Sequence, residues 1–197
     1  MSDKQIPVLR YVDGQEREKR ISIRGTSLKV SGEDIAIIDL SVLRSCPELE
    51  KISFSDNKLE SIDLSPIASC RGLRELFLSS NQLMEVDLSP LKHCNRLEIL
   101  SLSRNRISTI DLTTLRYTPN LEILALSRNQ LVTIELQPLE VCKKLRELYL
   151  SGNRLENLDL SPLKFCEDLE IIDVSYNPLE KIDLTPLRSN SQLRIIE

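Results

Sequence analysis

Tryptophan is absent from this 197-residue sequence, aromatic residues make up only 4% of it, and glycine occurs five times. So few glycines leave no glycine-rich loop that would cradle a phosphate group. No apolar run is long enough to cross a membrane, and residues 1–15 lack the apolar stretch of a signal peptide, so we expect a cytoplasmic protein without membrane contact. Basic residues show no excess, since the net charge is −4, and we therefore expect no nucleic-acid partner.

What the sequence does contain is a repeat of 24 residues, marked most clearly by an asparagine. The asparagines at this spacing are Asn57, Asn81, Asn105, Asn129, Asn153 and Asn177. The frame around Asn81 consists of Leu73, Leu76, Leu78, Leu83, Val86, Asp87, Leu88, Pro90, Leu91 and Cys94. Units that repeat in this way stack one coil on the next, so chain length sets the number of coils.

The pattern LxxLxLxxN at a fixed period resembles that of leucine-rich repeat proteins, and the resemblance covers residues 25–197. It implies a fold of the α/β class: a curved, right-handed solenoid with a parallel β-sheet on its concave face and short helical or 3-10 turns on its convex face. It also implies a protein partner on the concave face, with no cofactor and no metal. Extracellular members commonly have disulfide-bonded caps, whereas no cysteine here precedes Cys46 or follows Cys166, which favours the cytoplasmic type.

The first part of the chain, residues 1–24, lies outside the repeat. Residues 1–5 are expected to be disordered. Two runs of residues with alternating character lie between Ile6 and Arg24. Val8, Arg10 and Val12 precede the turn residues Asp13 and Gly14, and Ile21, Ser22 and Ile23 follow them. This pattern predicts a β-hairpin that caps the first coil and covers its apolar interior.

The second part, residues 25–197, is predicted to be the repeat domain. It begins with a degenerate coil, residues 25–48, in which Glu33 takes the place of the asparagine. Six full repeats occupy residues 49–192, and residues 193–197 form a partial strand. An uncovered strand edge at that end predicts possible self-association, because an exposed edge invites pairing.

Each repeat is expected to hold one strand, one sharp turn and one short helical segment. The stretch equivalent to Glu75–Ser79 alternates inward and outward, which predicts a parallel strand, and seven or eight such strands form one sheet. The inward asparagine is expected to bond both N–H and C=O groups at the turn, because its amide donates and accepts. On the return path we expect Ser65 to be a helix N-cap and Pro66 the first helical residue.

Two columns of chemically reactive side chains recur with the repeat. The cysteine column contains Cys46, Cys70, Cys94, Cys142 and Cys166, and the acidic column contains Asp39, Asp63, Asp87, Asp111, Glu135, Asp159 and Asp183. We interpret the cysteines as small buried side chains, and not as disulfides or metal ligands, because Thr118 and Asn190 replace them within the column. A calcium site in the acidic column is disfavoured, since each coil supplies one carboxylate and no glycine-bearing calcium loop is present.

Catalysis is not expected from this sequence. The sole histidine, His93, has no nucleophile to complete a triad, because the serines at fixed places recur in every coil as parts of the scaffold. We therefore predict that the protein is not an enzyme.

Function is expected at outward strand positions that break the repetition. The predicted partner-binding residues are Phe77, Ile99, Ile123, Tyr149 and Ile171 as apolar anchors, with Arg104, Arg128, Asp173 and Tyr176 as a polar rim. Ile195 is assigned to the same outward column as Ile171. The alternatives are that the isoleucines only favour strands and cover one another, or that Tyr117, Val141 and Phe165 on the convex side bind instead.

The functional prediction is a non-catalytic protein-protein interaction module of unknown partner. Two alternatives stay open: a substrate-recognition segment of a larger signalling or ligase enzyme, and a purely structural scaffold.

Overall fold

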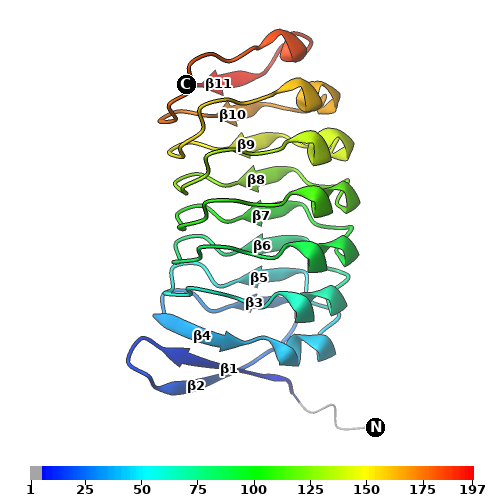
Figure 1. Cartoon of the computed structure of the whole chain (residues 1–197). Coiled ribbons are helices and arrows are strands. Elements are labelled where there is room, and N and C mark those ends of the chain that lie inside the picture. The colour runs from blue at the N-terminus through cyan, green and yellow to red at the C-terminus, as the bar shows by residue number, and fades with distance from the viewer. Residues whose placement is uncertain (1–5) are drawn as a thin grey trace.

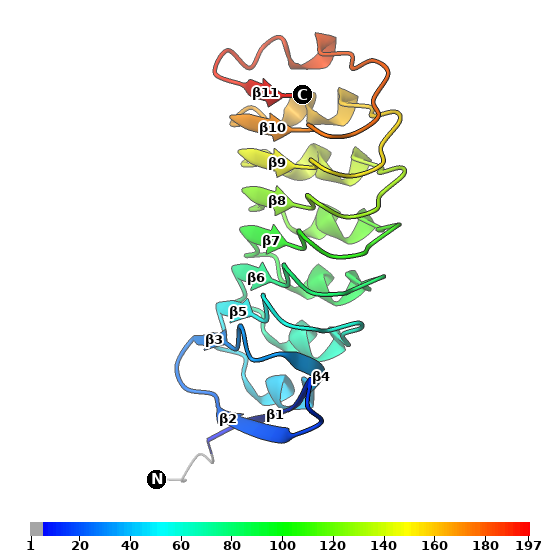
Figure 2. The ribbon, with the colours of Figure 1, turned by 90° about the vertical axis from the view of Figure 1, so that its left-hand side faces the viewer.

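The structure, a computed structural model, describes residues 6–197, so the expected disorder of residues 1–5 lies outside the described part. The chain winds into a stack of coils with strands on one side and short helices on the other (Figures 1 and 2). The main sheet has eight strands in the order β11-β10-β9-β8-β7-β6-β5-β3, all parallel. The predicted solenoid with one continuous parallel sheet is confirmed.

The elements of the stack are short and evenly spaced. The strands are β3 (Ser27–Lys29), β5 (Lys51–Ser53), β6 (Glu75–Phe77), β7 (Ile99–Ser101), β8 (Ile123–Ala125), β9 (Glu147–Tyr149), β10 (Ile171–Asp173) and β11 (Arg194–Ile196). The 3-10 helices are η1 (Ser41–Ser45), η2 (Ser65–Ser69), η3 (Ser89–His93), η4 (Thr113–Tyr117), η5 (Gln137–Val141), η6 (Ser161–Phe165) and η7 (Thr185–Leu187). Each strand has three residues, fewer than the five predicted.

Leucines from the strands, turns and return paths form one apolar interior that runs the length of the stack. In β6, Leu76 is fully buried while Glu75 and Phe77 on either side of it are half-buried. Glu75 pairs with Ile99 of the next strand, exactly one repeat away, so equivalent residues form columns along the stack. The period of the sequence is therefore also the register of the sheet.

The asparagines form a ladder that joins neighbouring coils. The side-chain nitrogen of Asn105 donates to the carbonyl oxygen of Leu102 at 2.9 Å and to that of Leu78, in the preceding coil, at 3.0 Å. Its side-chain oxygen accepts from the backbone N–H of Leu83 at 3.0 Å. The expectation that one amide serves both kinds of backbone group is confirmed, and each asparagine bonds two coils at once.

The 3-10 helices begin differently from the prediction. Ser65 is the first residue of η2 and not its N-cap, and Pro66 follows as the second residue. The backbone N–H of Ser65 donates to Asp63 Oδ1 at 2.8 Å, and its hydroxyl donates to Asp63 Oδ2 at 3.0 Å. The aspartate thus accepts at the start of the helix, because its side chain reaches an N–H two residues further on, as such side chains do at turns.

This bond explains most of the acidic column. The equivalent backbone bonds are Ser41 to Asp39, Ser89 to Asp87, Thr113 to Asp111, Ser161 to Asp159 and Thr185 to Asp183. Hydrogen bonds from Ser65 hold the pKa of the Asp63 carboxyl below its usual value, and Ser161 does the same for Asp159. These carboxylates are used by the scaffold itself.

The cysteine column is buried, as expected. All five cysteines are free. Burial raises the pKa of the thiols of Cys70, Cys142 and Cys166 to about 12. Thr118 replaces a cysteine in η4's coil, is fully buried, and donates from its hydroxyl to the carbonyl of Leu115 at 2.9 Å.

The predicted hairpin is present but is part of a larger cap. β1 (Val8–Asp13) pairs with β2 (Glu18–Ser22) and also with β4 (Ile35–Asp39), giving a three-stranded antiparallel sheet. Leu9, Tyr11 and Asp13 are buried on one face of β1, whereas Val8 is exposed. Only the pairing with β4 decides which face covers the first coil.

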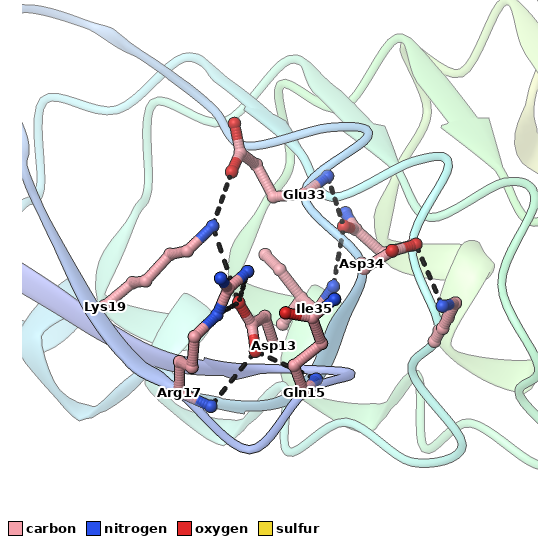
Figure 3. A network of polar contacts seen from close by, with 9 residues as sticks. Asp13, Gln15, Arg17, Lys19, Glu33, Asp34 and Ile35 are labelled. Atoms are coloured by element: carbon pink, nitrogen blue, oxygen red, sulfur yellow. Dashed lines mark hydrogen bonds and ion pairs between the residues drawn. The ribbon is translucent and has the colours of Figure 1, made fainter.

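Asp13 organises the turn of the hairpin (Figure 3). Its carboxylate accepts from the backbone N–H groups of Gln15 and Arg17 and from Arg17 Nε at 2.8 Å. The hydrogen bond from the Arg17 side chain is the main reason that the pKa of Asp13 lies well below its usual value. The Lys19 ammonium lies near this carboxylate and forms an ion pair with Glu33 at 3.2 Å. This ion pair links the hairpin to the first coil.

The last strand departs from the 24-residue register. Ile171 pairs with Arg194, and Ile172 with Ile195, so β11 is shifted by one residue. The assignment of Ile195 to the outward column is therefore wrong: Ile195 packs against the core, and Arg194 takes the outward place. A one-residue shift exchanges the two faces of a strand, and a terminal strand with one neighbour in the described chain has fewer contacts to specify its register.

Candidate functional site

The outward residues of β5 to β10, together with the turns that follow these strands, form what we call the sheet face. The structure brings all nine predicted residues into three neighbouring columns within it. Phe77, Tyr149 and Asp173 share the last strand position, whereas Ile99, Ile123 and Ile171 share the first. All six are half-buried, so the isoleucines are less exposed than predicted. Arg104, Arg128 and Tyr176 occupy the turns and are exposed.

The two aromatic anchors are held by neighbouring charged residues. Lys51 Nζ lies 4.9 Å from the centre of the Phe77 ring and forms an ion pair with Glu75. The Tyr149 hydroxyl donates to Glu147 at 2.8 Å, and burial together with this bond raises the pKa of Tyr149 to about 12. Each ring is thus presented in one orientation, which reduces the entropy lost when a partner covers it.

Between these rings, strands β7 and β8 place no charged side chain on the sheet face. Ile99 is paired with Ile123, and beside them Ser101 is paired with Ala125. Ser101 and Ala125, at the last strand position, are small. The side chains of Ile99 and Ile123 therefore have no large neighbour at that position. We call these outward residues of β7 and β8 the apolar strip, and along the stack Phe77 lies on one side of it and Tyr149 on the other.

The residues that follow the strands have an uncommon backbone conformation, which the sequence analysis did not foresee. Arg104, Arg128 and Tyr176 have φ values of 58°, 56° and 56°, in the left-handed region. Glycine takes the same place in two coils, at Gly32 and Gly152, with φ of 72° and 66°. The sequence offered one signal of this conformation, which is that glycine holds this position in two of the coils.

A side chain at such a position carries an energetic cost that glycine avoids. The left-handed conformation costs a residue with a Cβ about 1–2 kcal/mol. The backbone N–H of Arg104 donates to the backbone carbonyl oxygen of Ser127, in the next coil, at 2.8 Å. This backbone hydrogen bond between coils imposes the conformation. Asp56 and Ser80 have the same conformation in their coils, with φ of 57° and 55°, so it belongs to the repeated turn and does not by itself mark a binding site.

Two further arginines lie in the turns that follow the strands, and neither was among the predicted residues. Arg106 and Arg154 follow the ladder asparagines Asn105 and Asn153, and both are exposed. We define the arginine rim as Arg104, Arg106, Arg128 and Arg154. Within the described chain none of the four side chains forms a hydrogen bond or an ion pair.

The rival surface on the turn side is more exposed than expected. Tyr117 is 54% exposed and Phe165 is 44% exposed, whereas Val141 between them is half-buried. Lys164 Nζ lies 4.8 Å from the centre of the Phe165 ring. Arg116 and Lys164 lie beside this column in η4 and η6, and neither forms an ion pair in the described chain.

The described residues show no arrangement that points to metal chemistry. Over residues 6–197, no group of three or more His, Cys, Asp or Glu side chains is placed to hold a metal ion. None of the helices described in the chain has the length and apolar character needed to cross a membrane.

Comparisons with protein-family models match most of the repeat region. A model described as "Leucine rich repeat" matches residues 95–155, and a model described as "Leucine Rich repeats (2 copies)" matches residues 47–93, 71–117 and 143–189. A search of curated proteins found no match.

Solved structures with the same architecture come from bacteria and a plant. An internalin, inlF, from Listeria monocytogenes is 27% identical, with a TM-score of 0.70 over 87% of this chain and 47% of its own. Internalin C2 from the same organism is 28% identical, with a TM-score of 0.71 over 86% of this chain and 69% of its own. The leucine-rich-repeat ectodomain of a membrane receptor kinase from Arabidopsis thaliana was solved in complex with CASPARIAN STRIP INTEGRITY FACTOR 2. It is 28% identical, with a TM-score of 0.71 over 79% of this chain and 19% of its own.

Proposed function

The chain belongs to the leucine-rich repeat family, and from that premise we propose that it is a non-catalytic module that binds a protein partner on its sheet face. Proteins of this family commonly serve in protein-protein interaction. One of the similar structures, the plant ectodomain, was solved in complex with a second protein. This chain corresponds to about half of the first internalin and a fifth of the plant ectodomain, so the partners of those proteins are not assigned to it.

The observation that supports the proposal is the combination of half-buried isoleucines with exposed arginines beside them, which have no acidic partner in the described chain. Ile99 and Ile123 lie at the centre of the strip, and Arg104 and Arg128 follow the same two strands. An extended sheet holds all four in fixed positions. Apolar anchors at the centre and charged groups at the border are the usual composition of a protein-binding surface.

A serine triple variant of the sheet face, Phe77→Ser, Ile99→Ser and Tyr149→Ser, tests the proposal. The matched control changes Tyr117, Val141 and Phe165 to serine on the turn side, which likewise removes two aromatic side chains and one aliphatic side chain. Both variants are first compared with the intact chain by circular dichroism and thermal unfolding. In affinity capture from the parent cells, the sheet-face variant should lose a protein that the control variant retains. Loss only in the control variant would place binding on the turn side and refute the proposal.

A second candidate is that the chain is the recognition segment of a larger protein. The observation that favours it is the receptor kinase, in which a similar fold forms part of a longer chain. The full reading frame distinguishes the candidates, since an adjoining catalytic domain would support the second. In that case the sheet face would still be the surface that selects the partner.

We also propose that the protein acts in the cytoplasm. Five free and buried cysteines support a reducing compartment. Fractionation of parent cells that express a tagged chain provides the test, and recovery in the secreted fraction would contradict this proposal.

A further inference from the structure

The two edges of the sheet face differ in charge. Before the strands, the chain places Arg74, Glu98, Glu122, Arg146 and Glu170. Arg74 is paired with Glu98, and Arg146 is paired with Glu170 at 2.7 Å. After the strands, the coils that begin at residues 97, 121 and 145 place the four members of the arginine rim. The first edge thus holds two ion pairs and leaves Glu50 and Glu122 without one, whereas the four arginines of the second edge have no ion pair in the described chain.

The arginine rim is unusual for a protein whose net charge is −4. Its four guanidinium groups are exposed, and in the described chain they have no acidic partner. Two acids of the sheet face have neutral hydrogen-bond donors as partners, since Glu147 accepts from the Tyr149 hydroxyl and Asp173 accepts from Ser175, and both keep their negative charge. In the described chain no carboxylate forms an ion pair with the arginine rim, so its guanidinium groups are available to a negatively charged ligand.

Gly152 opens the space beside Arg128. A Cβ at position 152 would lie 3.3 Å from Arg128 Cγ, so the Arg128 side chain rests against this bare backbone. The next residue of the column, Tyr176, is 88% exposed. The stem of the Arg128 side chain therefore occupies the room that the missing side chain at position 152 leaves.

Resting on the proposed function, we propose that the segment of the partner bound by the sheet face is an acidic peptide stretch. Its carboxylates pair with Arg104 and Arg128. Its aliphatic side chains cover Ile99 and Ile123. A guanidinium presents a planar pair of N–H donors that matches a carboxylate, and this geometry gives both attraction and orientation.

The dimensions of the sheet agree with such a segment. Adjacent strands lie about 4.8 Å apart, and an extended chain advances about 3.3 Å per residue. A peptide that runs along the stack therefore places side chains of one side at roughly 6.6 Å intervals. One carboxylate can reach both Arg104 and Arg128, or two carboxylates on the same side can each take one of them.

A polyphosphate chain fits less well than an acidic peptide. The strip between the arginine rim and the paired edge is apolar, and Glu122, Glu147 and Asp173 border it. Repeated phosphates that cross the strip would meet these carboxylates without gaining a partner. The observations thus favour a peptide in which acidic and aliphatic residues alternate.

Selection from a random-peptide library displayed on phage, with the intact chain as bait, tests this inference. Selected peptides should be enriched in Asp and Glu and contain aliphatic residues between them. Synthetic copies are then measured by fluorescence polarisation against the intact chain, against Arg104→Glu with Arg128→Glu, and against a control. The control, Arg44→Glu with Arg116→Glu, makes the same charge change on the turn side, in η1 and η4.

The rim variant should bind the selected peptides on the order of ten-fold to a hundred-fold more weakly, while the control should bind normally. Peptides with Lys in place of their acids should bind the rim variant better than the intact chain. Such a reversal reports charge pairing and not a loss of fold. Binding should also weaken as salt is raised.

The possible failures are distinguishable. Selected peptides that lack acids but lose binding in the sheet-face serine variant would overturn this inference and leave the proposed function standing. Peptides that bind both the rim variant and the serine variant normally would refute both. Failure to enrich any sequence would count against an acidic peptide. Tighter binding of a single-stranded oligonucleotide than of any selected peptide would show that the arginine rim serves nucleic acid instead.

Discussion

Replacing Asn105 by alanine should destabilise the solenoid, and the structure indicates which bonds decide by how much. Asn105 donates to the carbonyls of Leu78 and Leu102 and accepts from the N–H of Leu83. Both carbonyls also accept from a second asparagine, Asn81 for Leu78 and Asn129 for Leu102. Only the Leu83 N–H is left with no partner after the substitution.

The magnitude follows from this difference between donor and acceptor groups. A buried polar group without a partner costs about 1–3 kcal/mol, and loss of an ordinary hydrogen bond costs about 0.5–1.5 kcal/mol. Because each carbonyl keeps one bond, the cost is one unpaired N–H and two lost hydrogen bonds, and we expect the free energy of unfolding to fall by about 2–6 kcal/mol in total. That is a large share of the stability of a single domain.

Asn177→Ala provides the matched comparison at the end of the ladder. Asn177 makes the same bonds, to the N–H of Leu155 and the carbonyls of Leu150 and Val174. It is only half-buried, however, so water can replace the amide. We expect a loss of about 1 kcal/mol or less at this position.

Urea unfolding followed by circular dichroism measures both variants, and amide hydrogen exchange reports the Leu83 N–H directly. In Asn105→Ala this N–H should exchange faster than its neighbours. Equal losses of stability in the two variants, or a loss below about 1 kcal/mol at Asn105, would refute the reasoning from unpaired groups.

Three further predictions concern strain, acid and thiols. Arg104→Gly should raise the free energy of unfolding by about 0.5–1 kcal/mol, because relief of the left-handed backbone exceeds the entropy that glycine adds to the unfolded chain; a decrease in urea unfolding would show that the position is not strained. The carboxyls of Asp39, Asp63 and Asp159 have lowered pKa values in the folded chain, so their stabilisation is complete above the unfolded pKa and is lost as pH falls below about 4. Thermal unfolding across pH should show this loss, and a smaller loss in Asp63→Asn; an identical acid dependence in the variant would contradict the assignment. The raised thiol pKa values predict that all the free cysteines react slowly with a disulfide reagent until urea unfolds the chain, and rapid labelling of native protein would disprove their burial.

Much of the fold followed from the period of the sequence. Leu76 and Leu78 are buried, Asn81 bonds two coils, and Cys94 lies inside the column, as their places in the repeat predicted. These residues sit in coils with equivalent neighbours on both sides. Their surroundings can therefore be inferred from the repeat alone.

The candidate site followed the sequence only in part. Irregular outward residues indicated Phe77, Tyr149 and the arginines at 104 and 128, but the positive φ of these arginines was not evident from their residue type. Arg106 and Arg154 were overlooked because a charged residue in a turn is ordinary. Their importance depends on which acids lie nearby, and only the folded chain shows that Glu98 and Glu170 are already paired.

The sequence by itself determined the coil, its stacking register through β10 and the composition of its interior, because a repeated pattern meets a copy of itself at every step. The tertiary structure alone decided how the repetition ends and which charges remain unpaired. β4 joins the cap sheet and sets its buried face, β11 shifts by one residue, and Asp63 takes the helix bond expected of Ser65. Each of these outcomes depends on contacts between unlike neighbours, whose energies a local pattern does not contain.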